Sequence, residues 1–367
     1  MIVAPRRVAL ATPLPLDCGR TLSTVELVYE QYGELNPERS NAILVCHGLT
    51  ADHHAAGRRD PADRRPGWWD AAIGPGKAID TRRWCVIAPN ALGGGASTGP
   101  TTLEPDAGRP YGQRFPVVTI GDMVRAQAAL LDALGIARLH AAIGGCMGGF
   151  QVLTWMAQYP RRLARAIAIG TTARVSAYTI ALWKVMREAI RLDPDWRGGD
   201  YYDTGAPTRG VQLMSRIGAL IWIERSLLEQ RYGNRRRPGL DQPSYDFTTE
   251  FEVEALFDRI GQGEAAGLDV NALMYLMRAM DYFDLQRGHP SLAAAFGSLP
   301  VKTLLVSYSS DWRYPPGEID EIRAALQERG WPVVHERLDS PFGHGAFLHD
   351  FPSLAPLLRA FLQDPTT

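Results

Sequence analysis

Cys146 stands in the middle of a glycine-rich stretch, Gly144-Gly145-Cys146-Met147-Gly148-Gly149. An apolar run comes before it and a helical pattern follows, which is the Gly-x-nucleophile-x-Gly form of a sharp turn from a strand into a helix. Glycines flank the nucleophile in such a turn because a side chain there would collide with the neighbouring strand or helix. A cysteine taken alone is most often a small buried apolar residue. In this setting we predict a thiol nucleophile, at a position where serine is usual.

A nucleophile of this kind needs a base, and the base needs a carboxylate that holds its tautomer. When the nucleophile lies on such a turn, the acid follows it in the chain and the histidine lies near the C-terminus. Asp311 follows the strand-like run 301–307, and His344 lies in a glycine-flanked loop before the last helical pattern. His344 alone could be an ordinary loop histidine, but the order and setting together predict a catalytic triad of Cys146, His344 and Asp311.

Acyl transfer also requires backbone N–H groups directed at the oxygen that becomes negative, and losing one such donor costs about 3–4 kcal/mol. Met147, directly after the nucleophile, can supply one N–H from the start of its helix. The second donor should lie in the loop after an early strand, where Gly48 and Leu49 follow the apolar run 41–45. We predict that Leu49 completes this oxyanion hole, with Gly48 as the next candidate.

The elements that must hold these residues alternate between strand-like and helix-like patterns, which predicts an α/β fold with a mostly parallel central sheet. From residue 175 to about 287 helical periodicity dominates, which predicts an inserted all-helical lid. We therefore expect an α/β core formed by 1–172 and 301–367, and a lid formed by 173–300. The expected strands are 25–32, 41–46, 84–88, 139–143, 164–169, 301–307 and 332–337, and the expected core helices are 120–134, 151–159, 319–328 and 354–362.

Composition limits the possible partners. The 39 Lys and Arg residues nearly balance the 40 Asp and Glu residues, so no charge excess points to nucleic acid or an acidic membrane, and a small-molecule substrate is expected. No apolar run approaches the roughly 20 residues that span a bilayer, and no signal-peptide pattern is visible, so we expect a cytoplasmic protein. The four cysteines show no CxxC or zinc-finger spacing, so we expect no bound metal and no disulfide.

Beyond these patterns, the sequence resembles the homoserine O-acetyltransferase family of α/β hydrolases along nearly its whole length, which implies the α/β-hydrolase fold. The matching stretches are His47-Gly48-Leu49-Thr50-Ala51-Asp52, Asn90-Ala91-Leu92-Gly93-Gly94, Ser97-Thr98-Gly99-Pro100, Pro110-Tyr111-Gly112, Phe115-Pro116, Gly144-Gly145-Cys146-Met147-Gly148-Gly149, Met280-Asp281-Tyr282-Phe283-Asp284, Ser310-Asp311-Trp312 and Gly343-His344-Gly345-Ala346-Phe347-Leu348.

The resemblance implies an acyl-enzyme on Cys146, with His344 as general base and Asp311 as its orienting carboxylate. It also implies that Arg216 in the lid binds the substrate carboxylate, which suits a planar guanidinium, although Arg216 alone could form a surface salt bridge. Acyl-CoA, with acetyl-CoA as the first candidate, would be the co-substrate in a ping-pong reaction, with no bound cofactor. Family members commonly dimerise through lid helices, so a homodimer is expected.

Two departures from the family pattern bear on the substrate. Cys146 replaces the usual serine, so the expected intermediate is a thioester, and a thiolate forms readily beside a histidine. Gly345 replaces the aspartate that usually follows the catalytic histidine and contacts the amino group of the acceptor. This removes the expected partner of an ammonium group, so an acceptor other than homoserine is one of the expectations.

These observations lead to one main hypothesis and two alternatives. We expect an acyltransferase that moves an acetyl or other short acyl group from acyl-CoA, through a Cys146 thioester, to the hydroxyl or amine of a small carboxylate-bearing acceptor. The acceptor would be homoserine-like, serine-like or a secondary-metabolite intermediate. The first alternative is a thioesterase or esterase that uses the same triad. The second is an inactive relative that acts as a binding protein.

Overall fold

An eight-stranded sheet forms the centre of the computed structural model, which describes residues 1–105, 107–240, 242–263 and 269–365. The strand order is β1-β4-β8-β5-β9-β10-β11-β12. The strands from β8 to β12 are parallel, whereas β4 runs antiparallel to both β1 and β8. Their bounds are β1 Arg6–Ala9, β4 Glu26–Tyr32, β5 Ala42–Cys46, β8 Cys85–Pro89, β9 Ala141–Gly145, β10 Arg165–Ile169, β11 Lys302–Tyr308 and β12 Val333–Leu338.

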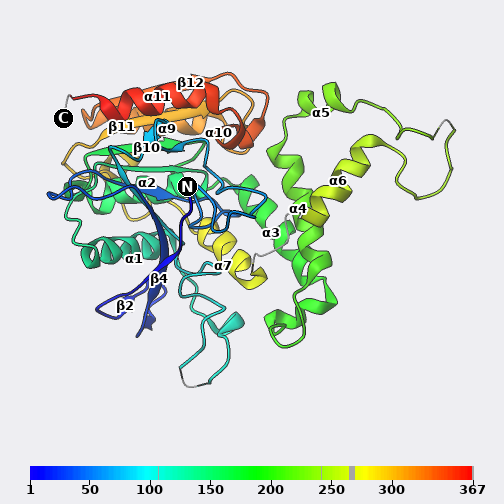
Figure 1. Ribbon diagram of the computed structural model, residues 1–367, viewed down its shortest axis with the longest axis horizontal. Helices are drawn as coiled ribbons and strands as arrows, with labels where there is room; N and C mark the ends of the chain where they lie inside the picture. The colour runs from blue at the N-terminus through cyan, green and yellow to red at the C-terminus, as the bar shows by residue number, and fades with distance from the viewer. Residues whose placement is uncertain (106, 241, 264–268, 366–367) are drawn as a thin grey trace.

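The central strands are buried on both faces. Every residue of β5, β8, β9 and β10 is buried, which explains why these strands appear in the sequence as continuous apolar runs. Helices flank the sheet (Figure 1). They are α1 Ile120–Ala133, α2 Met147–Gln158, α9 Pro316–Glu328, α10 Ala346–His349 and α11 Phe351–Gln363, with the short 3-10 turns η1 Gly112–Arg114, η2 Pro160–Arg162 and η4 Gly343–Gly345. The predicted α/β fold with a mostly parallel central sheet is therefore confirmed.

Most predicted core elements lie within one to three residues of the observed ones, but α2 begins four residues earlier than expected, at Met147. The reason is local, because Cys146 is itself the N-cap residue and the helix starts directly after it. The sequence did not predict β1 or the two short two-stranded sheets, the antiparallel pair β2 (Leu14–Pro15) with β3 (Thr21–Leu22) and the parallel pair β6 (Ile73–Gly74) with β7 (Ile79–Asp80).

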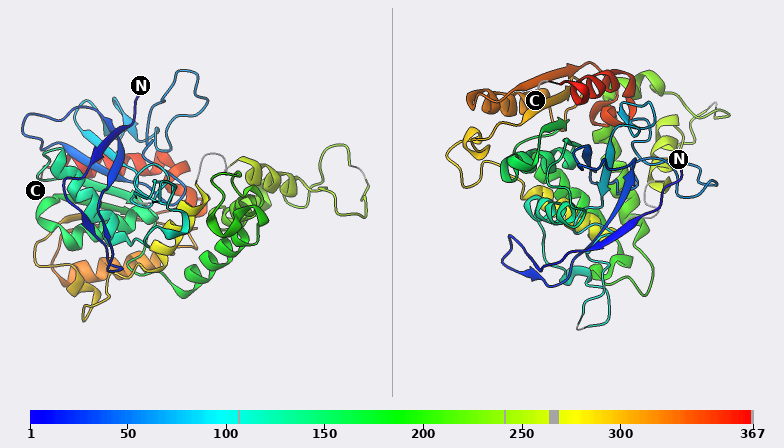
Figure 2. Two further views of the ribbon diagram at one scale, coloured as in Figure 1. Left: turned by 90° about the horizontal axis from the view of Figure 1, so that it is seen from below. Right: turned by 60° about the vertical axis from the view of Figure 1, so that its left-hand side comes forward.

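Between β10 and β11 the described elements are all helical, and those within residues 177–263 extend away from one side of the core (Figure 2). Lid helix α4 contacts α3, α6 and the turn η4, so the lid reaches the loop that carries His344. The bounds are α3 Ala177–Arg191, η3 Pro194–Gly199, α4 Thr208–Trp222, α5 Arg225–Arg231, α6 Glu252–Gly263, α7 Val270–Asp281 and α8 Leu292–Ala295. None of the helices in the described ranges has the length and apolar character needed to cross a lipid bilayer.

Candidate active site

The turn between β9 and α2 holds Cys146 in a strained backbone conformation. Its φ is 57°, in the left-handed region that non-glycine residues seldom adopt. Two neighbouring glycines permit the turn because a side chain at either would meet backbone. A Cβ atom at Gly144 would lie 2.4 Å from the carbonyl carbon of Gly148, and one at Gly148 would lie 2.1 Å from the carbonyl oxygen of Cys46. The nucleophile is thus fixed by close backbone packing around it.

The structure brings the three predicted triad residues together at the carboxyl edge of the sheet. Asp311 lies in the loop after β11, and His344 lies in η4; both side chains are buried. His344 Nδ1 is 2.8 Å from Asp311 Oδ2. The other carboxylate oxygen accepts hydrogen bonds from the backbone N–H groups of Arg313 and Tyr314, at 3.0 and 3.1 Å. Asp311 is therefore held in place and can orient the imidazole.

Charge around Cys146 favours the thiolate. Burial alone would raise the pKa of the thiol, but the Arg313 guanidinium and His344 lower it to about 7. Burial would likewise lower the pKa of His344, but Asp311 and Cys146 raise it to about 9. His344 Nε2 is buried without a hydrogen bond of good geometry among the described residues, and Cys146 is the partner with which the ring interacts. Near neutral pH a substantial share of Cys146 is therefore thiolate beside an imidazolium, the reactive form of a Cys–His pair.

The predicted oxyanion hole residues also lie beside the nucleophile. Met147 is the first residue of α2, and its backbone N–H interacts with the Cys146 thiol group. The loop after β5 approaches from the other side, since a Cβ atom at Gly48 would lie 3.8 Å from Cys146 Cβ. Leu49 follows in this loop and is buried. The Met147 N–H thus lies at the thiol and the loop that carries Leu49 lies beside it, while the role of both residues in an oxyanion hole remains a prediction.

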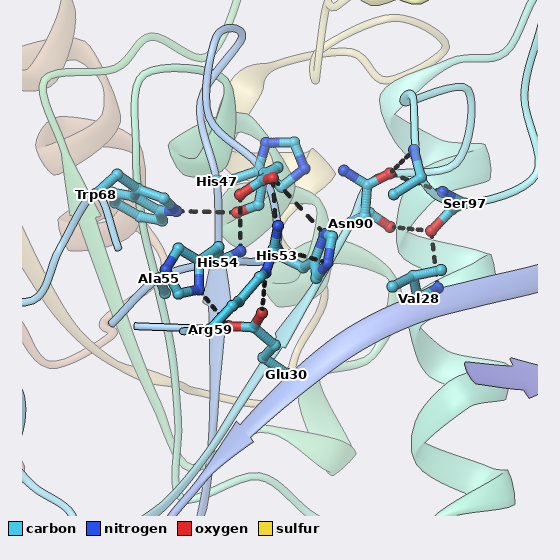
Figure 3. Close-up of polar contacts among 12 residues, drawn as sticks. Val28, Glu30, His47, His53, His54, Ala55, Arg59, Trp68, Asn90 and Ser97 are labelled. Carbon is cyan, nitrogen blue, oxygen red and sulfur yellow. Dashed lines mark hydrogen bonds and ion pairs between the residues drawn. The ribbon is translucent and has the colours of Figure 1, made fainter. Parts of the chain in front are cut away.

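Buried polar contacts fix the segment that contains Leu49, and Figure 3 shows those that Glu30 makes with His54 and Arg59 further along it. His47 Nε2 accepts a hydrogen bond from the Ala91 N–H at 2.9 Å, so its Nδ1 carries the proton and donates to the Gly48 carbonyl at 2.7 Å. Burial lowers the pKa of His47, which agrees with a neutral ring. His47 therefore has a structural role, because its ring links the loop after β5 to the segment at Ala91.

The far end of the same loop is held by Glu30 of β4. This fully buried carboxylate contacts His54 Nδ1 at 2.8 Å and Arg59 Nε at 2.9 Å. Arg59 in turn lies 2.9 Å from His53 Nε2. Because a buried carboxylate is tolerated only when it is paired, this network ties the loop to the sheet.

A cavity of about 570 Å³ lies between the lid and the catalytic loops. Leu49 and Arg313 line it from the core, and Trp183, Met214 and Trp222 line it from α3 and α4. Trp222 also packs edge-on against the His344 ring, with centroids 5.4 Å apart. The cavity is therefore bordered by residues that surround the Cys146–His344 pair, namely Leu49, Arg313 and Trp222.

Arg313 is a charged residue of this site that sequence reasoning missed. It is 3% exposed, and its guanidinium lies 4.2 Å from the centroid of the Trp183 ring. Its Nε and Nη2 atoms are buried without a hydrogen bond in the described part of the chain. A cation in an otherwise apolar and aromatic segment, two residues after Asp311, was the available signal. A buried guanidinium with free N–H groups is suited to bind an anion.

Arg216, predicted to bind the substrate carboxylate, does not line the cavity in this structure. Its Nε donates to the Phe257 carbonyl at 3.1 Å, and its Nη2 lies 3.5 Å from Asp258 Oδ1. On α4 the cavity is lined instead by Met214, Ser215 and residues one turn later. Arg216 therefore faces α6, and its role in binding substrate remains a prediction.

Comparison with known proteins gives the family. Residues 41–351 match the model of the α/β hydrolase fold. The chain is 43% identical over 354 residues to homoserine O-succinyltransferase of Alkalilimnicola ehrlichii, covering 96% of this chain and 92% of that protein.

Solved structures support the same family assignment. The crystal structure of homoserine O-acetyltransferase from Bacillus anthracis superposes with a TM-score of 0.92 at 31% identity, covering 100% of this chain and 99% of that one. Esterase E22 superposes with a TM-score of 0.87 at 32% identity, covering 99% of this chain and 100% of that one. With this similarity along the whole chain, the protein belongs to the homoserine O-acetyl- and O-succinyltransferase family of α/β hydrolases.

Proposed function

We propose that this protein transfers a short acyl group with a terminal carboxylate, of the succinyl class, from acyl-CoA to the hydroxyl of a small acceptor. The single observation that supports the choice of acyl group is Arg313, a buried guanidinium with unsatisfied N–H groups beside Cys146. Buried guanidinium N–H groups without hydrogen-bond partners are costly, and a bound carboxylate would satisfy them through charge-assisted hydrogen bonds. Homoserine, which the names of relatives give as their acceptor, is the reference against which other acceptor alcohols are compared.

In the first half-reaction the Cys146 thiolate attacks the thioester carbonyl carbon of acyl-CoA. The negative oxygen of the tetrahedral intermediate accepts hydrogen bonds from the N–H groups of Leu49 and Met147. The bond from carbon to the CoA sulfur then breaks, and the His344 imidazolium gives its proton to the departing CoA thiolate. The acyl group remains on Cys146 as a thioester, and His344 is left neutral with Asp311 on its Nδ1 side.

In the second half-reaction neutral His344 accepts the hydroxyl proton of the acceptor while the oxygen attacks the Cys146 thioester. A second tetrahedral intermediate forms in the same oxyanion hole. Its carbon–sulfur bond breaks, which releases the ester and restores the Cys146 thiolate beside the His344 imidazolium. The resting ion pair expected from the pKa shifts is therefore the state from which the cycle starts and to which it returns.

Ester hydrolysis is the second candidate function, and the similarity to esterase E22 favours it. Water would then replace the acceptor in the second half-reaction, with the same triad. The two functions differ in one measurable respect: an acyltransferase consumes acyl-CoA faster when an acceptor alcohol is added, and an esterase does not depend on one.

The test is intact-protein mass spectrometry after mixing with succinyl-CoA or acetyl-CoA, together with CoA release. We expect acylation that Cys146→Ala abolishes, and a higher acylation rate with succinyl-CoA. Arg313→Met should lower the succinyl-to-acetyl rate ratio about 10- to 100-fold, since a hydrogen-bonded charge contributes about 1.5–3 kcal/mol. Losing the guanidinium also raises the Cys146 pKa, but this slows acylation by both donors alike and therefore does not change the ratio of their rates. Absence of an acyl-enzyme with either donor would disprove acyl transfer through Cys146, and an unchanged ratio would remove Arg313 from acyl recognition.

A further inference from the structure

A second, smaller cavity of about 230 Å³ adjoins the catalytic histidine. Its walls come from the end of α4, from α5 and α6, and from the loop around His344. Most of the lining is apolar or aromatic, namely Trp222, Ile223, Leu227, Leu228, Tyr232, Leu256 and Phe342, with Arg231, Gly345 and His349 completing it. Three of these residues, Trp222, Ile223 and His349, also line the larger active-site cavity, so the two cavities meet beside His344.

Gly345 keeps the junction of the two cavities open. A Cβ atom at this position would lie 3.2 Å from His349 Cδ2 and 3.4 Å from Trp222 Cε3, and both of those residues line both cavities. A side chain at 345 would therefore project into the junction. With glycine there, a substrate held at His344 can extend into the smaller cavity.

The charges around the two cavities do not suit an ammonium group. No Asp or Glu is among the described residues that line them, while Arg65 and Arg313 line the larger cavity and Arg231 lines the smaller one. Burial also lowers the pKa of His349, which keeps that ring neutral. An ammonium group placed here would lose its hydration without gaining a counter-ion and would face guanidinium groups of the same sign.

We propose that the smaller cavity binds the apolar body of the acceptor, which is an alcohol without an amino group. This inference rests on the proposed acyl transfer and specifies its acceptor. A cavity of about 150 Å³ can hold benzene, so 230 Å³ accommodates an aryl ring or a short branched alkyl chain with a linker. The hydroxyl then lies at His344 while the apolar end lies among Leu227, Leu228 and Phe342.

The acceptor preference can be measured on the acyl-enzyme after CoA has been removed. Loss of the acyl group from Cys146 is followed by intact mass with L-homoserine, with its deamino analogue 4-hydroxybutanoate, with straight-chain alcohols and with 2-phenylethanol. We expect 4-hydroxybutanoate to react at least about tenfold faster than homoserine, and each added methylene to raise kcat/KM about fourfold until the cavity is full. Faster reaction with homoserine than with both the deamino and the apolar acceptors would overturn the proposal.

Variants separate the cavity from the rest of the site. Leu228→Trp should fill the cavity and slow 2-phenylethanol without preventing acylation of Cys146, whereas Leu192→Trp, at a 79% exposed position, should change neither. Gly345→Asp should increase the use of homoserine relative to 4-hydroxybutanoate, and the uncharged Gly345→Asn should not. An equal effect of both Gly345 variants would contradict the charge-based part of the inference.

A direct binding experiment keeps the inference testable if acyl transfer itself fails. Calorimetric titration of the unacylated protein with 2-phenylethanol should detect binding that Leu228→Trp removes and Leu192→Trp keeps. Binding without any acyl-enzyme would disprove the proposed function but retain the cavity as an apolar alcohol site. An acyl-enzyme with no such binding and no apolar-alcohol turnover would disprove only the acceptor assignment.

Discussion

At the scale of single residues, the charge state of Cys146 is the property most open to direct measurement. Arg313 and His344 together outweigh burial and lower the thiol pKa from 9.0 to about 7. Since the thiolate is the species that alkylates, the rate at which Cys146 reacts with iodoacetamide should increase with pH and be half-maximal near pH 7. His344→Ala should move this midpoint upward. Exposed Cys18, followed by peptide mass in the same samples, is the internal reference; a Cys146 midpoint at or above that of Cys18 would contradict the ion pair.

The residues that the sequence predicted share one property: their roles follow from local chain order. Cys146, Asp311 and His344 each stand in a turn or loop after a recognisable strand or before a recognisable helix, so fold logic places them together. Chain order alone does not indicate a role for Arg313, because that role depends on stacking against Trp183 from a different element. The same reason explains Trp222, whose contact with His344 depends on how the lid closes over the core.

At the scale of elements, the turn that carries Cys146 should be intolerant of any added atom. Gly148→Ala would place a Cβ atom 2.1 Å from the Cys46 carbonyl oxygen, a backbone atom of β5 that cannot easily move. We expect a loss of about 3 kcal/mol in the free energy of unfolding, measured by urea denaturation. Gly317→Ala is the matched control, because a Cβ atom in this first turn of α9 meets nothing within 4 Å. It should be neutral or slightly stabilising; equal losses would show that the turn has room.

The strands of the core were predictable because a strand that is buried on both faces consists of consecutive apolar residues. The short pairs β2–β3 and β6–β7 have two residues per strand, which is too little for any periodicity to appear. In the lid the helices were predictable but their rotation was not. Neighbouring residues on a helix point about 100° apart, so Ser215 lines the cavity while Arg216 faces α6. Which of these two residues faces the cavity depends on how α4 packs against its neighbours.

At the scale of the whole molecule, lid helix α4 leaves an apolar stripe uncovered. Leu213 and Leu220 lie seven residues apart on one face and are 46% and 59% exposed, with half-buried Ile217 between them. A stripe of this kind at helical spacing is suited to pack against a copy of itself in a two-fold symmetric dimer. We therefore expect the protein to form a homodimer through α4, and Leu213→Glu with Leu220→Glu to convert it to a monomer, because the carboxylates would be desolvated and face each other across the interface.

Sedimentation velocity over a range of protein concentrations measures this directly. Leu192→Glu is the matched control, because Leu192 is 79% exposed at the end of α3 and lies off the stripe, so this variant should remain dimeric. Acylation of Cys146 in the double variant separates dissociation from unfolding, since all three triad residues come from the core of one chain. The monomer should keep the acyl-enzyme but bind acceptor less firmly, because α4 also contributes Trp222 to both cavities. A dimeric double variant would place the contact elsewhere, and a monomeric wild type would leave the stripe without this role.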